Sequence, residues 1–276
     1  MSQPETTALS KEQIEQRLAE SVEATRGSSW VRRVGPFTPL LLLLIWEVCS
    51  RTGVLDVRFF PAPSSIVETF GKMIADGALL MHTKATLLRI LVGYLMGAIP
   101  GILFGLLLGS VRPVRQLLEP IFASLLPIPK IAIFPLLLLI FGLGEMSKYL
   151  IIAIGVFFYL LFNTMSGVMQ VPPLFNDVAR ANGATGIQRR LTVSLPYALP
   201  SIFTGLKLAA GAAFVVIAAA EFVGSQSGLG YLIWSAWSTF AVSKMYVGIV
   251  TISVLGYAVT VLMGYAERKL VPWIKY

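Results

Sequence analysis

Six long apolar runs alternate with shorter polar segments along this chain of 276 residues. Each run has close to the ~20 residues with which an α-helix crosses ~30 Å of hydrocarbon. Inside a bilayer the backbone must satisfy its own hydrogen bonds, and a helix does so within a single segment. We therefore predict an all-α membrane protein with six transmembrane helices. The predicted spans are about 34–50, 86–109, 117–142, 147–169, 197–220 and 245–265.

The composition agrees with a chain that is surrounded by lipid. Hydrophobic residues make up 56% of the chain and charged residues 13%, whereas soluble domains carry about 25% charged residues. The net charge is +8, but the basic residues lie at the ends of the apolar runs and form no single patch, so we expect no nucleic-acid partner. Cys49 and His82 are the single cysteine and the single histidine. We therefore expect no metal site and no catalytic residue.

The distribution of Lys and Arg predicts the orientation in the membrane. If the N-terminus is cytoplasmic, the loops at 110–116 and 170–196 and the C-terminal tail share that side, which then carries most of the basic residues. This favours two cytoplasmic termini, with 1–30 as a cytoplasmic N-terminal segment and 31–276 as the transmembrane domain. The segment 51–89 is a basic exception, and its amphipathic pattern predicts a helix at the outer interface.

Four glycines share one face of the second predicted span. Gly93, Gly97, Gly101 and Gly105 are spaced four residues apart, so they line up along a helix. Small residues at this spacing allow two helix backbones to approach closely. We expect this face to be a helix-packing surface.

One polar stretch, residues 172–196, separates two of the spans. Asn176 or Asp177 is predicted to cap a short helix, and Gly183 to end it. A second, basic helix is predicted to begin near Thr185 or Gly186, with Leu195-Pro196 closing the loop and starting the next span. The result is a helix–turn–helix that projects from the membrane and is thin enough to enter a groove on another protein.

This stretch resembles the coupling loop of ABC importer permeases, whose pattern is E-A-A-x-x-x-G followed about a dozen residues later by L-P. The family positions fall on Asp177, Val178, Ala179, Gly183, Leu195 and Pro196, with Arg180 and Ala184 inside the loop. Asp177 replaces Glu and Val178 replaces Ala, and both departures are mild. The resemblance implies that these eight residues form the ATPase-coupling loop.

Three further segments resemble the nitrate/sulfonate/taurine/bicarbonate permease group. They are PAPSSIVETF at 61–70, the proline-rich stretch 125–148, and 202–233, which ends in GLGYLI. The resemblance implies a type I ABC importer permease with MetI-like architecture in the bacterial inner membrane. It also implies three kinds of protein partner: a second copy of the chain, two cytoplasmic ABC ATPases, and a periplasmic or surface substrate-binding protein.

The chain contains no G-x-x-x-x-G-K-[ST] phosphate loop. We therefore expect that it is not an enzyme and binds no cofactor, and that ATP and Mg sit on the partner ATPases. The predicted function is translocation of a small, anionic solute (nitrate, bicarbonate, sulfonate or taurine class) by alternating access. A secondary transporter that needs no ATPase and a membrane enzyme are the alternatives.

Ionisable residues beside or within the spans are further functional hypotheses, because charges are costly in a bilayer. Lys130, Lys207, Glu221 and Gly228 are predicted to line the translocation path or a gate. The alternatives are structural. Lys130 would snorkel or hold free carbonyls at the proline break, Lys207 would lie at the cytoplasmic interface, and Glu221 would form an ion pair.

Overall fold

The computed structural model describes residues 37–273, all of whose regular elements are helices. The predicted all-α class is confirmed over these residues, whereas the predicted N-terminal segment 1–30 lies outside them. The chain divides into two units at Ser64. In the first, α3 (Thr38–Arg51) leads into a loop held to it by hydrogen bonds. Ser50 Oγ donates to the Phe60 carbonyl (2.9 Å), and Glu47 accepts from the Ser64 amide (2.9 Å).

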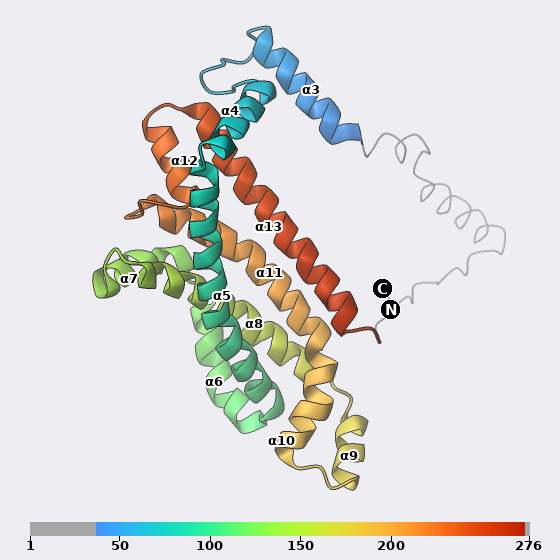
Figure 1. Cartoon of the computed structure of the whole chain (residues 1–276). Coiled ribbons are helices and arrows are strands. Elements are labelled where there is room, and N and C mark those ends of the chain that lie inside the picture. The colour runs from blue at the N-terminus through green and yellow to red at the C-terminus, as the bar shows by residue number, and fades with distance from the viewer. Residues whose placement is uncertain (1–36, 274–276) are drawn as a thin grey trace, which may run out of the picture. The chain divides into compact units, whose positions relative to one another are not determined.

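The second unit contains the long helices (Figure 1). Its elements are α4 (Pro63–Ala75, which begins at the end of the first unit), α5 (Ala78–Ser110), α6 (Arg112–Leu125), a 3₁₀ turn η2 (Lys130–Ile133), α7 (Phe134–Phe141), α8 (Glu145–Met169), α9 (Pro173–Ala181), α10 (Gly186–Arg189), a π-helical turn η3 (Arg190–Ser194), α11 (Leu195–Phe222), α12 (Leu229–Ser238) and α13 (Val242–Leu270).

The glycine face of α5 is a helix-packing surface, as predicted, and the helix that it contacts is α8. A Cβ atom on Gly93 would lie 2.7 Å from the Tyr149 carbonyl oxygen, and one on Gly97 would overlap the backbone of Ala153. These distances leave room for hydrogen only. The glycines therefore bring α5 and α8 into backbone contact.

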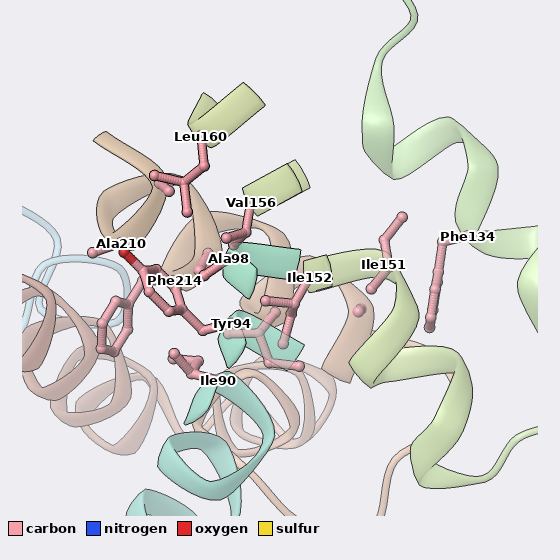
Figure 2. Packing of buried hydrophobic residues seen from close by; sticks show 14 of the residues in the cluster. Ile90, Tyr94, Ala98, Phe134, Ile151, Ile152, Val156, Leu160, Ala210 and Phe214 are labelled. Carbon is pink, nitrogen blue, oxygen red and sulfur yellow. The ribbon is translucent and has the colours of Figure 1, made fainter. Parts of the chain in front are cut away.

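A buried apolar cluster joins α5, α8 and α11. Figure 2 shows Tyr94 of α5, Ile152 of α8 and Phe214 of α11 lying together in it. The Tyr94 hydroxyl donates a 2.6 Å hydrogen bond to the Leu206 carbonyl of α11, which satisfies the one polar atom that the ring brings into the cluster.

Four helices in the described residues are long and apolar enough to cross a membrane: α5, α8, α13 and the continuous helix Gly186–Phe222. A fifth span results if α6 and the η2–α7 segment, which meet at 85°, count as one broken span. The described part of the first predicted span, α3, has only 14 residues. The count of six spans therefore stays a prediction.

The helix predicted at the outer interface exists as α4. Its burial follows the amphipathic pattern only in part, because Ile66 and Met73 are buried while Val67 and Ile74 are exposed. Its depth in the membrane stays a prediction.

Candidate functional site

The first helix of the polar loop starts earlier than predicted. Asn176 and Asp177 lie within α9, which begins at Pro173 with Pro172 as its N-cap residue. Proline suits this first position, because its fixed φ matches the helix and the missing N–H would have no partner there. The prediction that Asn176 or Asp177 caps the helix was therefore wrong.

The predicted break at Gly183 is confirmed. Gly183 has a φ of +76°, in the left-handed region that side chains disfavour. Its amide donates to the Arg180 carbonyl (2.9 Å), and the Ala184 amide donates to the Ala179 carbonyl (3.0 Å). These bonds satisfy carbonyls at the end of α9 and reverse the chain.

Thr185 starts the second helix of the loop, also as predicted. The Gln188 amide donates to Thr185 Oγ1 (3.3 Å), and the Gln188 side-chain oxygen accepts from the Thr185 amide (2.8 Å). This reciprocal pair is a capping box. It fixes where the turn ends and α10 begins.

The second half of the loop is continuous with a span. α11 begins at Leu195 as predicted, but no turn precedes it, because α10, η3 and α11 follow one another without interruption. Pro196 has no amide hydrogen to offer the Thr192 carbonyl, and the π-helical turn lies just before it. A displacement of the loop tip would thus reach the membrane along one helix.

The predicted coupling residues lie on both arms of this loop. Asp177, Val178, Ala179 and Arg180 are on α9, with Arg180 Nη1 3.8 Å from Asp177 Oδ1. The remaining predicted residues, Gly183, Ala184, Leu195 and Pro196, lie in the turn and at the start of α11. Their role in coupling stays a prediction.

At the opposite end of α11, Glu221 is fully buried in a polar cluster. Arg89 of α5 donates from Nη1 to Glu221 (2.8 Å) and from Nε to Glu145 of α8 (2.6 Å), and Lys148 donates to Glu145 (3.1 Å). Thr86 also donates to Glu221, at 3.0 Å. The structural alternative for Glu221, an ion pair, is therefore present.

The partners of Glu221, Arg89 and Thr86, are not evident from the sequence. Both lie more than one hundred residues before it. A basic residue in an apolar helix was the available signal, but a single sequence does not say which acid it meets.

Gly228 completes this cluster. Its φ is +112°, and a Cβ atom there would overlap the Glu221 carboxylate. Its amide donates to His82 Nδ1 (3.2 Å), and the next amide, of Leu229, donates to Thr86 Oγ1 (2.7 Å). Glycine is thus required for the turn from Gly224 to Gly228 to close over the carboxylate.

Lys130 lies where α6 gives way to η2 and α7. Its Nζ donates to the carbonyls of Leu125 (2.8 Å), Leu126 (3.0 Å) and Ile128 (3.0 Å), and sits 4.4 Å from the centre of the Phe158 ring. It also lines a cavity of about 470 Å³ whose other walls come mainly from α8 and α11. Lys130 therefore holds free carbonyls at the proline break, which was the structural alternative. Its role in the translocation path stays a prediction.

Lys207 of α11 forms an ion pair with Glu267 of α13 (2.8 Å). Glu267 is almost completely buried, whereas the Lys207 side chain keeps 30% of its surface exposed. The pair ties α11 to α13 near the end of α13. Whether Lys207 also faces the solute stays a prediction.

The residues that the structure describes hold no group of three or more His, Cys, Asp or Glu side chains suited to a metal ion. The polar side chains described above form ion pairs, at Glu221 and Lys207, and a helix cap, at Thr185.

Known proteins resemble the chain over most of its length. The profile of the family described as "Binding-protein-dependent transport system inner membrane component" matches residues 101–272. The aliphatic sulfonates transport permease protein SsuC of Bacillus subtilis is 35% identical over 88% of each chain. The nitrate import permease protein NrtB of Leptolyngbya laminosa is 34% identical over 71% of each chain.

A solved structure shares the fold. A chain of the MetNI methionine ABC transporter, in an inward-facing conformation, superposes with a TM-score of 0.58 at 21% identity, over 69% of this chain and 93% of that one. The predicted MetI-like fold is confirmed at this level. The chain belongs to the binding-protein-dependent transport system inner membrane component family, as a multi-pass ABC importer permease of the group that contains the sulfonate, taurine and nitrate permeases.

Proposed function

We propose that this chain is the transmembrane subunit of an ABC importer that moves a small anionic solute by alternating access, driven by a separate ATPase. The observation that carries the proposal is the loop α9–Gly183–α10, whose second arm continues through η3 into α11. A partner that grips the turn at Gly183 would move α11 as a lever, and rigid helix movements of this kind switch a transporter between its two states.

The proposed assembly contains two copies of this chain, two cytoplasmic ABC ATPases and a periplasmic or surface binding protein. The chain itself would bind no cofactor, and ATP and Mg would sit on the ATPases. Both termini and the loop would face the cytoplasm. Relatives named for aliphatic sulfonates, taurine and nitrate support a sulfonate or a small oxyanion as the solute.

Within the membrane, we assign the apolar cavity beside Lys130 to the path. Three carbonyls already accept from the Lys130 ammonium, so this group would attract an anion by its field rather than bind it tightly. Weak attraction suits a transport path, because the solute must leave as well as enter. Lys207, near the middle of α11, and Glu221, at its end, would hold this helix to its neighbours, and the turn at Gly228 would form the outer gate.

The coupling role is tested with Gly183→Pro in the complete transporter, reconstituted in liposomes with its ATPases and binding protein. Proline cannot adopt the φ of +76° and has no amide for the Arg180 carbonyl. We expect the permease to insert normally, while solute-stimulated ATP hydrolysis and uptake are lost.

Gly186→Pro is the matched control. Gly186 is the first residue of α10, where proline is favoured, so ATP-driven uptake is expected to persist. Uptake at the wild-type rate by the Gly183→Pro transporter would overturn the proposed lever. Uptake that continues without any ATPase would instead support a secondary transporter.

A further inference from the structure

A polar cavity of about 350 Å³ lies between the coupling loop and the ends of two spans. Ser110 at the end of α5 and Val168 near the end of α8 form its membrane-side wall. The two arms of the loop form the rest, with Asp177 and Arg180 from α9 and Arg189 and Arg190 from the second arm. The cavity thus lies at the base of the loop, away from the turn at Gly183, which does not line it.

The charges around this cavity do not balance. Three arginines line it, against one acidic residue. Asp177 lies 3.8 Å from Arg180, near the limit for an ion pair. In the part of the chain that the structure describes, the side chains of Arg189 and Arg190 form neither a hydrogen bond nor an ion pair. The cavity therefore keeps an excess of positive charge.

The guanidinium groups of Arg189 and Arg190 have no acceptor within the described residues. Guanidinium groups form their strongest hydrogen bonds with planar or tetrahedral oxyanions. We propose that this cavity is a binding site for a small oxyanion of the sulfate or sulfonate class, held by Arg180, Arg189 and Arg190.

A free anion fits the cavity better than a side chain of a partner protein. The walls on the membrane side and on both flanks come from this chain itself, whereas a partner that grips the loop would meet the turn at Gly183. The volume is more than ten times the ~30 Å³ that one water occupies in the liquid, so it can hold an oxyanion with a few waters. The anion would bridge α9 to α10 and η3. The anion would reach the cavity from the cytoplasm if the proposed orientation holds. The site itself does not depend on that orientation.

The test measures equilibrium binding of radiolabelled sulfate to the full-length chain in lipid nanodiscs, at constant ionic strength. Methanesulfonate and phosphate serve as competitors, and chloride as the control salt. We expect saturable binding that methanesulfonate displaces and that chloride at equal ionic strength does not. Arg189→Gln should weaken binding about tenfold or more, because it removes a charge-assisted donor.

Two further variants test the site. One should tighten sulfate binding, and the other is a control that should leave it unchanged. Asp177→Asn removes the one carboxylate and should tighten binding about threefold. This gain of affinity requires a folded protein. Arg268→Gln removes an equivalent charge from an exposed residue near the end of α13 and should leave binding unchanged. Equal weakening by Arg189→Gln and Arg268→Gln, or weaker binding in Asp177→Asn, would overturn the site.

The assembled transporter decides whether a free anion or a carboxylate of the ATPase occupies the cavity. If a free anion is the ligand, the permease bound to its ATPases should bind sulfate as the isolated chain does. Loss of sulfate binding on assembly would overturn the proposal that a free anion binds there, and would assign the cavity to a carboxylate of the ATPase. Both measurements are of binding and not of uptake. Failure of the proposed anion site can therefore be distinguished from failure of the proposed coupling role.

Discussion

Arg89 Nη1 and Glu221 Oε1 lie 2.8 Å apart in a pair that joins α5 to α11 across 132 residues of sequence. Their side chains are 5% and 0% exposed. Every neighbouring contact supports the charges, since Arg89 also donates to the Ser227 carbonyl (2.6 Å) and Glu221 also accepts from the Gly230 amide (2.8 Å). The pair therefore holds the start of α12 against α5 and α11.

Removing one partner of this pair should be strongly destabilising. Glu221→Met leaves Arg89 with Glu145 as its one remaining acidic partner, and Arg89→Met leaves the buried Glu221 carboxyl without its cationic partner, at a cost of about 3–5 kcal/mol for such a broken pair. The double variant should lose less stability than the sum of the single variants. The measurement is the thermal midpoint of the detergent-solubilised protein, followed by fluorescence-detected gel filtration.

Arg58→Met is the control for that series. Arg58 and Asp56 form an exposed pair at 2.8 Å, and exposed pairs contribute about 0–1 kcal/mol. Additive losses in the Arg89 and Glu221 variants would show that the two charges do not depend on each other.

The contact between α5 and α8 predicts the effect of one added methyl group. Gly97→Ala would drive a Cβ atom into the backbone of Ala153, and overpacking of this kind costs about 1–3 kcal/mol. Gly264→Ala in α13, where no atom lies within 4 Å of the added group, should be tolerated. Equal thermal midpoints for the two variants would contradict the close packing.

Lys130 can be tested for its two roles separately. Lys130→Met removes three hydrogen bonds to carbonyls at the bend between α6 and α7, and should lower the thermal midpoint and slow uptake of the anionic solute. Lys130→Arg keeps the charge and can still donate to carbonyls, so it should recover part of the uptake. Unchanged uptake in Lys130→Met would show that the residue has a structural role only.

The Lys207–Glu267 pair predicts a charge-swap rescue. Lys207→Glu would place two carboxylates side by side between α11 and α13 and should lower the thermal midpoint. Adding Glu267→Lys should restore most of the loss, because the ion pair is rebuilt with its ends exchanged. A double variant as unstable as Lys207→Glu alone would show that the pair has no energetic coupling.

The features that the sequence predicted are those that depend on neighbours along the chain. Apolar length marked the spans, a four-residue spacing marked the glycine face at Gly93 and Gly97, and Gly183 marked the turn of the loop, because only glycine takes its φ without strain. The local prediction failed at Asn176 and Asp177, where a proline at the first helical position began the helix four to five residues earlier.

The sequence by itself determined a helical membrane protein with one projecting polar loop, because hydrophobic length and backbone hydrogen bonding are properties of single segments. Only the tertiary structure decided that Glu221 meets Arg89, that Lys207 meets Glu267, and that three arginines surround one cavity at the base of the loop. These contacts join residues far apart in the chain. Their energies depend on distance and burial, which helix packing sets and sequence separation does not.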